Sequence, residues 1–278
     1  MIIKLRSYAK INLALSINYK RSDGYHDISS IMQEIDLFDS LEISLNHTNH
    51  INIISKGIKV PEDESNLCHI ATKLFFNQYN LNQGVDIIIH KRIPVGAGLG
   101  GGSSNAATTI RGLGQLFNIN INENIFHQFS NKIGADVFFF YNGGTQYAEK
   151  IGDKLTPLPH LLDNYYFLLI CPDINISTSW AYKEYKKYLE NYLNPPNFVP
   201  LSDKLKWSTL RNDFEKVVLS TYPEIMKIKI KLKNSGALFS SLSGSGSTMF
   251  GVYDNRELIR RSSNLFNDYQ TYEALPVN

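Results

Sequence analysis

The feature that most restricts how this chain can fold is a glycine-rich stretch placed directly ahead of a helical pattern. Residues 94–104 read PVGAGLGGGSS, with five glycines among the seven residues 96–102. Because glycine lacks a Cβ atom, its backbone adopts positive φ angles, and successive N–H groups can converge on one anion. Residues 104–117 then repeat apolar side chains at helical spacing. We expect Ser103 or Ser104 to cap this helix, whose positive N-terminal end faces the same anion, so the stretch predicts a phosphate site.

Other interpretations of the glycines fit less well. A flexible linker is seldom followed at once by a capped amphipathic helix. Gly96, Gly98 and Gly101 satisfy G-x-G-x-x-G, and Glu123 lies near the distance expected of a ribose-binding acid, but residues 91–95 separate the first glycine from its strand. A P-loop lacks its Gly-Lys-Ser/Thr. An NAD-dependent oxidoreductase and a non-catalytic nucleotide-binding module stay open as alternatives.

Charge and composition exclude several classes of partner. The 278 residues are 43% hydrophobic, which is enough for a folded core in one large or two modest domains. Lys plus Arg number 28 against 26 Asp plus Glu, so no strong global field attracts nucleic acid or a membrane. The lysines at 183, 186 and 187 alternate with tyrosines and are interpreted as a solvated helix face, not an RNA patch. We expect no nucleic-acid and no membrane partner.

The cysteines and the first residues predict a cytoplasmic location. Cys68 and Cys171 stand in apolar runs without the spacing of a metal or redox motif. The first twenty residues lack the pattern of a secretion signal, and no apolar run approaches the roughly 18 residues of a membrane span.

The order of elements predicts an α+β fold class. We expect strands at residues 2–8, 11–17, 41–45, 51–54, 85–90, 165–170, 237–242 and 248–253 and near Tyr272, with a break between the first two. We expect helices at residues 66–79, 104–117, 125–133, 180–190, 213–219, 223–233 and 256–266, with a loop at Asn194-Pro195-Pro196. Two prolines within 156–159 place a domain junction there, giving domains 1–157 and 158–278.

Four strings carry a family resemblance: SYAKINLAL at 7–15, PVGAGLGGGSSNAA at 94–107, IGADVFFF at 133–140 and LSGSGSTMFGVY at 242–253. Together they resemble the kinase superfamily of galactokinase, homoserine kinase, mevalonate kinase and phosphomevalonate kinase. The string RSDGYHDI at 21–28, followed by Gln33, is similar to members that act on a cytidine diphosphate-linked methylerythritol. The other members of the superfamily, for which this last string is incidental, form the alternative.

The resemblance implies a fold and a reaction. The fold is a two-domain GHMP-kinase architecture, with an N-terminal mixed α/β nucleotide-binding domain, a C-terminal ferredoxin-like α/β sandwich and the active site in the cleft between them. The reaction is ATP-dependent phosphorylation of the 2-hydroxyl of the methylerythritol in non-mevalonate isoprenoid biosynthesis. ATP is the co-substrate and Mg²⁺ is expected, without identified ligands. The sequence leaves a monomer or a weak homodimer open.

The resemblance also implies the catalytic pair, Lys10 and Asp136. An acceptor hydroxyl needs a group that takes its proton and a cation that favours the developing alkoxide, and these two residue types supply both. By themselves, Lys10 fits an exposed strand lysine and Asp136 an ordinary helix cap. Phe138 stands where the family usually has proline, which puts the local backbone geometry in question.

For the acceptor, the resemblance implies that Tyr25 stacks on cytosine and that His26 hydrogen-bonds its edge. Stacking and hydrogen bonding both suit a pyrimidine base, although a Tyr-His pair can also be part of a turn without any binding role. Asn12 is expected to contact the erythritol or the diphosphate. Its alternation with Lys10 predicts that both side chains lie on one face of a strand.

For ATP, the resemblance implies that Asn66 and Lys91 lie near the adenine, although a helix N-cap and a solvated lysine explain them equally well. The serine-glycine loop at 243–247 is either a plain hairpin turn or a loop brought to the substrate phosphates. The predicted phosphate cradle consists of Pro94, Val95, Gly96, Ala97, Gly98, Leu99, Gly100, Gly101, Gly102, Ser103 and Ser104.

Overall fold

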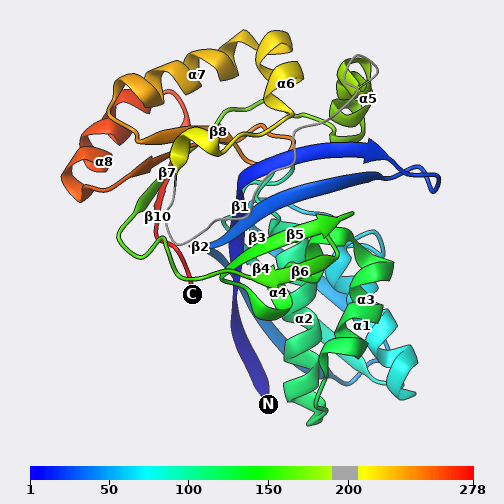
Figure 1. Cartoon of the computed structure of the whole chain (residues 1–278). Helices are drawn as coiled ribbons and strands as arrows, with labels where there is room; N and C mark the ends of the chain where they lie inside the picture. The colour runs from blue at the N-terminus through cyan, green and yellow to red at the C-terminus, as the bar shows by residue number, and fades with distance from the viewer. Residues whose placement is uncertain (190–205) are drawn as a thin grey trace. The chain divides into compact units, whose positions relative to one another are not determined.

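The computed structural model describes residues 1–189 and 206–278, so the predicted loop at Asn194-Pro195-Pro196 lies outside the described residues. The chain forms two compact units (Figure 1). Unit 1 comprises Met1–Ala9, Phe38–Val95 and Gly100–Asn142. Unit 2 comprises Lys10–Leu37, Gly96–Leu99 and Gly143–Asn278.

The strands and helices follow in mixed order, as the sequence predicts. The strands are β1 (Ile2–Lys20), β2 (His26–Asn46), β3 (Ile51–Gly57), β4 (Gly84–Lys91), β5 (Thr145–Lys150), β6 (Lys154–Pro157), β7 (Tyr166–Cys171), β8 (Phe239–Leu242), β9 (Met249–Tyr253) and β10 (Gln270–Ala274). The helices are α1 (Leu67–Tyr79), α2 (Gly101–Phe117), α3 (Glu123–Ile133), α4 (Phe139–Asn142), α5 (Thr178–Leu189), α6 (Glu215–Thr221), α7 (Pro223–Asn234) and α8 (Arg256–Ser263). None of the helices in these described residues combines the length and apolar character of a membrane span.

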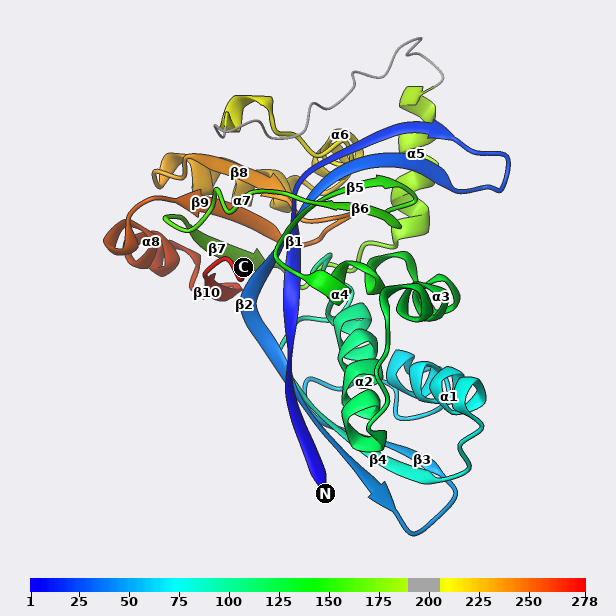
Figure 2. The same cartoon turned by 60° about the horizontal axis from the view of Figure 1, so that its bottom comes forward.

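In unit 1, three helices pack beside a group of strands whose order is β3-β4-β2. Strand β3 is parallel to β4, and β4 is antiparallel to the second half of β2. Alternate residues of β4, such as Ile87, are buried, as the period of two predicts. Helices α1, α2 and α3 contact one another (Figure 2) and bury large side chains such as Phe75 and Phe129. This packing holds α2 against α1 and α3.

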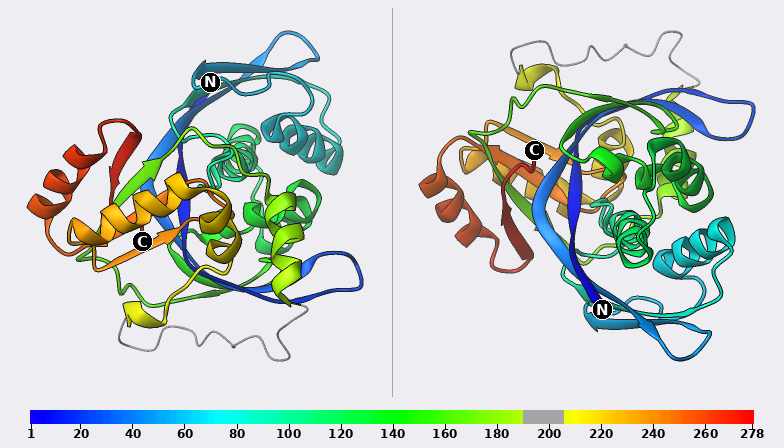
Figure 3. Two further views of the ribbon diagram at one scale, coloured as in Figure 1. Left: turned by 90° about the horizontal axis from the view of Figure 1, so that it is seen from above. Right: turned by 90° about the horizontal axis from the view of Figure 1, so that it is seen from below.

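Unit 2 contains a four-stranded sheet in the order β10-β7-β9-β8, in which all neighbours are antiparallel. Helices α7 and α8 pack on it (Figure 3), and Ile228 and Ile259 join Leu168 and Met249 in one buried cluster. This order of strands and helices is the ferredoxin-like arrangement, so the predicted C-terminal sandwich is confirmed. The first half of β2 also pairs with β5, and β5 pairs with β6.

The predicted break in the first strand is wrong, because β1 runs without interruption over 19 residues. Polar residues at and beside the predicted break are buried in the strand and have polar partners. The Ser7 hydroxyl donates to Ser104 Oγ at 2.7 Å, and Lys10 Nζ donates to Asn12 Oδ1 at 2.5 Å. The polar strands β5 and β6 were not predicted, since neither shows a regular apolar alternation.

Candidate active site

The glycine-rich stretch alternates left-handed glycines with buried side chains. Gly96, Gly98 and Gly100 have φ angles of 67°, 78° and 68°. Between them, Ala97 and Leu99 are 6% and 1% exposed. The Leu99 carbonyl accepts a hydrogen bond from Lys10 N at 3.0 Å. The apolar side chains therefore anchor the stretch, and three glycines adopt the conformation that an anion-binding nest requires.

Helix α2 begins three residues earlier than the sequence predicts, and neither Ser103 nor Ser104 caps it. Gly100 occupies the N-cap position without a side-chain hydrogen bond. Ser104 N already donates to the Gly100 carbonyl at 2.9 Å, and the Ser104 hydroxyl accepts from Ser7. A left-handed glycine thus turns the chain into the helix, which leaves the serines inside the first turn.

The two glycines that open α2 differ in how much room surrounds them. Their φ angles are not positive. A Cβ atom on Gly101 would lie 2.8 Å from Lys91 Nζ and 2.9 Å from Ile93 Cγ2. A Cβ atom on Gly102 would lie 3.4 Å from the Leu67 side chain. Gly101 is therefore required by packing, whereas Gly102 has room for a small side chain.

The serine-glycine loop 243–247 joins β8 to β9 and packs against the glycine-rich stretch. The Ser243 hydroxyl donates to the Gly98 carbonyl at 2.9 Å, and Thr248 N donates to the Ala97 carbonyl at 3.3 Å. The Asn212 amide donates to the carbonyls of Leu242 and Gly244 and fixes the loop from the other side. The loop is thus more than a hairpin turn, because it supports residues 96–99.

Lys10 and Asn12 lie on one face of β1, as their alternation predicts. Lys10 is 3% exposed, so it is not the exposed strand lysine of the alternative interpretation. Asn12 accepts from Lys10 Nζ and donates through Nδ2 to Ser30 Oγ at 2.8 Å. The Asn12 backbone N–H points to Ser243 Oγ at 3.4 Å. Unit 2 therefore gathers a buried cation, a carboxamide and the serine loop.

Asp136 lies in unit 1, in the short 3₁₀ turn Ala135–Val137 that follows α3. It is half-buried. The next residue but one, Phe138, has φ −66° and ψ −29°, and a proline has the same φ. The ring of Phe138 packs edge-on against His127 at 4.6 Å. Replacing the family's usual proline therefore leaves the backbone in the φ that proline would impose.

Tyr25 and His26 lie at the tip of the hairpin between β1 and β2 and have different surroundings. Tyr25 is 62% exposed. His26 stacks on Tyr182 of α5 at 4.7 Å and 14°, and Tyr182 meets Phe214 edge-on at 4.9 Å. Burial, assisted by the Lys20 charge, lowers the pKa of His26 below its ordinary value. Its buried Nε2 has no hydrogen-bond partner among the described residues.

Sequence reasoning missed Tyr182 because it assigned the Lys-Tyr cluster to a solvated face. The neighbouring Tyr185 is 4% exposed and belongs to the buried cluster of unit 2. Tyrosines at helical spacing are a signal for a packed face, and this signal was available in residues 182–188.

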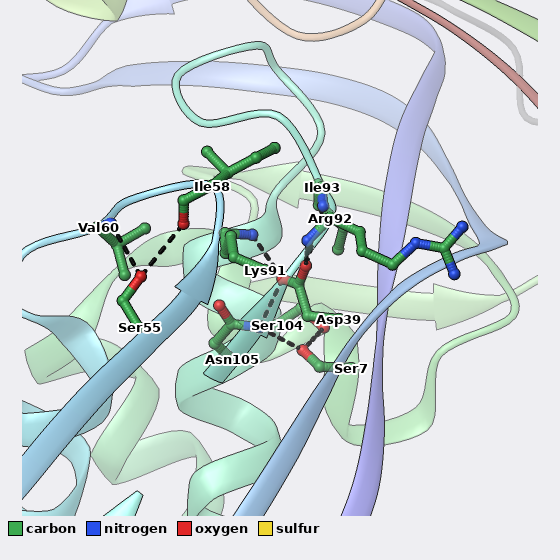
Figure 4. A network of polar contacts seen from close by, with 10 residues as sticks. All are labelled: Ser7, Asp39, Ser55, Ile58, Val60, Lys91, Arg92, Ile93, Ser104 and Asn105. Carbon is green, nitrogen blue, oxygen red and sulfur yellow. Dashed lines mark hydrogen bonds and ion pairs between the residues drawn. The ribbon is translucent and has the colours of Figure 1, made fainter. Parts of the chain in front are cut away.

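Asn66 is the N-cap of α1, as the sequence predicts. Its Oδ1 accepts from Cys68 N at 2.9 Å, and its Nδ2 donates to the Pro61 carbonyl at 2.6 Å. Lys91 is not a solvated lysine, because its side chain is 2% exposed and its Nζ lies 2.5 Å from Asp39 Oδ2 (Figure 4). Burial lowers the pKa of Lys91, and the Asp39 carboxylate opposes that shift.

The predicted site residues are distributed over both units. Unit 2 holds Lys10, Asn12, Tyr25, His26 and residues 96–99, and unit 1 holds Asn66, Lys91, Asp136, Pro94, Val95 and residues 100–104. Within the described part of the chain, no three His, Cys, Asp or Glu side chains gather as metal ligands.

Two domain families match the sequence. The GHMP kinases N terminal domain matches residues 66–144, and the GHMP kinases C terminal domain matches residues 195–265. The N-terminal match contains the glycine-rich stretch and Asp136. The C-terminal match contains the serine-glycine loop.

Curated relatives cover nearly the whole chain. A protein of Thermodesulfovibrio yellowstonii named 4-diphosphocytidyl-2-C-methyl-D-erythritol kinase is 40% identical over 283 residues, which cover 96% of this chain and 95% of the relative. The protein of the same name from Clostridium novyi is 41% identical and covers 90% of each chain.

Solved structures show the same fold. A crystal structure of 4-(cytidine 5'-diphospho)-2C-methyl-D-erythritol kinase matches with a TM-score of 0.79 at 24% identity, covering 99% of this chain and 100% of the other. The mevalonate kinase of Methanococcus jannaschii matches with a TM-score of 0.73 at 16% identity, covering 100% of this chain and 99% of the other. The chain therefore does not have the dinucleotide-binding fold that the G-x-G-x-x-G pattern left open, and that alternative is wrong.

Proposed function

The chain belongs to the 4-diphosphocytidyl-2-C-methyl-D-erythritol kinase family of GHMP kinases, and from that membership we propose how it acts. It transfers the γ-phosphoryl group of ATP to the 2-hydroxyl of 4-diphosphocytidyl-2-C-methyl-D-erythritol. The products are the 2-phosphate and ADP. This reaction belongs to non-mevalonate isoprenoid biosynthesis.

One observation carries the phosphate-binding part of the proposal. Three left-handed glycines alternate along 96–100 and lead directly into α2, which has 17 residues. The N–H groups of such a stretch and the positive end of a long helix both favour bound phosphate oxygens. We assign residues 94–104 to the ATP phosphates.

Lys10 and Asp136 are proposed to perform the transfer. The Asp136 carboxylate takes the proton of the 2-hydroxyl as that oxygen forms a bond to the γ-phosphorus and the bond from phosphorus to the ADP oxygen breaks. The Lys10 ammonium stabilises the negative charge that develops on the attacking oxygen. Its hydrogen bond to Asn12 holds the long side chain in one orientation, which supports this role.

Tyr25, His26 and Asn12 are proposed to bind the acceptor. The exposed ring of Tyr25 offers a face on which cytosine stacks. His26 is held by its stack on Tyr182, and its imidazole is proposed to hydrogen-bond the edge of the base. Asn12 reaches the erythritol or the diphosphate beside Lys10.

For ATP, Asn66 is proposed to lie near the adenine, with Lys91 beside it. Mg²⁺ commonly binds phosphate oxygens, several waters and one or two carboxylates, so we propose that it enters with ATP. When bound, it neutralises the charge of the phosphates. No residue is assigned to it.

Location, partners and domains complete the proposal. The free, buried thiols of Cys68 and Cys171 support a reducing cytoplasm. We propose small-molecule ligands and no nucleic-acid partner. That the chain is a monomer or a weak homodimer stays a prediction. The two family matches fall on either side of residue 157, which supports the boundary between domains 1–157 and 158–278.

The variant Asp136→Asn tests the proposed chemistry. We expect kcat to fall roughly 10²- to 10⁴-fold, because the amide cannot accept the proton. The Kd for ATP, measured by calorimetry, should stay unchanged. The exposed Asp268→Asn is the control and should keep wild-type turnover. A folded Asp136→Asn protein that binds ATP and turns over like the wild type would contradict the assignment.

A further inference from the structure

A buried carboxylate joins the two ends of the glycine-rich stretch within unit 1. Asp39, near the middle of β2, is 0% exposed and accepts four hydrogen bonds. Its Oδ1 accepts from the backbone N–H groups of Arg92 at 2.7 Å and Ile93 at 2.9 Å. Its Oδ2 accepts from Lys91 Nζ at 2.5 Å and Asn105 Nδ2 at 2.9 Å. One side chain therefore contacts the residues just before Pro94 and the first turns of α2 (Figure 4).

A second layer of polar contacts extends this network into the helix. Asn105 Nδ2 also donates to Ser7 Oγ at 2.8 Å, and the Ser7 hydroxyl donates to Ser104 Oγ. Ser7 is 0% exposed. The Lys91 side chain lies so close to Gly101 that a Cβ atom there would be 2.8 Å from Nζ. Each contact restrains either the entry to the stretch or the start of α2.

The chemistry of this network indicates a geometric role. Replacing a buried ion pair with apolar residues of similar volume is often neutral or stabilising, so stability alone gives weak reason for the pair. Two successive backbone N–H groups that meet one carboxylate oxygen, by contrast, fix the direction of the chain at residues 92–93. An apolar side chain cannot replace that constraint, because it accepts no hydrogen bond.

We propose that Asp39 is a positioning residue of the ATP site, which holds the two ends of the glycine-rich stretch in their phosphate-binding geometry through Lys91, the 92–93 amides and Asn105. Asp39 does not touch the nucleotide, because it is fully buried. The Lys91 ammonium is engaged by Asp39 and serves the same network. The inference rests on the proposed assignment of residues 94–104 to the ATP phosphates.

The first test compares Asp39→Asn with a matched carboxylate on the same group of strands. Asp86 of β4 accepts from the side-chain amides of Asn46 and Asn52, both at 2.8 Å, so Asp86→Asn is the control. We expect Asp39→Asn to raise the Kd and KM for ATP at least about tenfold, since mispositioned donors weaken binding. The Kd for the cytidyl acceptor should change less than about twofold in Asp39→Asn. In the control Asp86→Asn, the Kd and the KM for ATP should also change less than about twofold. Hydrogen exchange at the Arg92 and Ile93 amides should become faster in Asp39→Asn alone, because the neutral amide oxygen of asparagine is a weaker acceptor than a carboxylate.

Two further variants separate positioning from stability. Asp39→Asn combined with Lys91→Met removes both charges, so no uncompensated ammonium stays buried. We expect its Tm to recover towards the wild type while its KM for ATP stays raised. Ser7→Ala removes only the two hydrogen bonds that link Asn105 to Ser104 through Ser7, and it should raise the KM for ATP at least about threefold. It carries the test if Asp39→Asn does not fold.

The outcomes are distinct. A folded Asp39→Asn protein with wild-type affinity for ATP overturns the inference, as does a double variant whose KM for ATP recovers together with its Tm. An unchanged KM in Ser7→Ala overturns it where Asp39→Asn does not fold. Because ATP binding is measured without turnover, a wild-type protein that binds ATP but does not phosphorylate the cytidyl acceptor contradicts only the proposed function. A wild-type protein that does not bind ATP contradicts both.

Discussion

Ser243 lies directly against Gly98, although 145 residues separate them in the sequence. The Ser243 hydroxyl donates to the Gly98 carbonyl, and a Cβ atom on Gly98 would lie 2.0 Å from the Ser243 carbonyl oxygen. The family string at 242–253 thus contacts the string at 94–107 directly. Two features require glycine at position 98: its φ angle of 78° and the close approach of the Ser243 carbonyl.

This contact makes Gly98 and Gly96 a matched pair. Both have left-handed φ angles, but a Cβ atom on Gly96 would meet only Asn175 Oδ1, at 3.7 Å. We expect Gly96→Ala to lower the free energy of unfolding by about 1–2 kcal/mol, the strain of a left-handed alanine. Gly98→Ala should cost more than about 3 kcal/mol, because it also displaces backbone. Urea unfolding measures both, and equal values would contradict the close packing of Ser243.

The glycines that open α2 provide a second pair. Gly101→Ala should lower the free energy of unfolding by about 1–3 kcal/mol, because its methyl group meets Lys91 and Ile93 in a filled core. Gly102→Ala should raise it by up to about 1 kcal/mol, since alanine favours the helix and has room. Thermal unfolding checks the two signs. A destabilised Gly102→Ala with a stable Gly101→Ala would contradict the packing described here.

Tyr25 is expected to act on the acceptor without affecting stability. Base stacking on an aromatic ring contributes about 1–3 kcal/mol, so Tyr25→Ala should raise the KM for the cytidyl acceptor roughly 5- to 150-fold. Tyr25→Phe should keep the wild-type KM, because it retains the ring. Tyr19, which is 59% exposed on the same hairpin, provides the control Tyr19→Ala. Steady-state kinetics at saturating ATP measure the effect, and equal KM values for the two alanine variants would refute it.

The lowered pKa of His26 predicts a pH dependence of defined sign. Between its folded-state pKa and the ordinary value near 6.5, the unfolded chain binds more protons than the folded chain. The contribution of His26 to the free energy of unfolding is therefore complete above pH 6.5 and declines as the pH falls through that window. NMR titration of the ring gives the pKa. A His26 pKa above 6.5 would contradict burial as the cause.

Local signals predicted the parts of the site that depend on local chemistry. The Asn66 cap, the glycine-rich stretch and the shared face of Lys10 and Asn12 each follow from a few adjacent residues. The start of α2 was misplaced, because a serine cap is the commoner device and the left-handed turn at Gly100 has no separate signature.

Contacts over long sequence distance could not be predicted. Lys91 was interpreted as near adenine or solvated, since nothing in its neighbourhood shows that Asp39, 52 residues earlier, pairs with it. The stack of His26 on Tyr182 likewise depends on how α5 packs beside the hairpin. In both cases the partner is chosen by tertiary packing, which a local pattern does not encode.

The central claim is that this chain phosphorylates the cytidyl-linked methylerythritol at its 2-hydroxyl with ATP. The most direct measurement is phosphorus NMR of the product, with ADP release recorded in parallel for the cytidyl acceptor, mevalonate and homoserine. The account predicts one new phosphomonoester on the 2-hydroxyl and ADP release with the cytidyl acceptor alone. Turnover of mevalonate or homoserine with an unchanged cytidyl acceptor would contradict it.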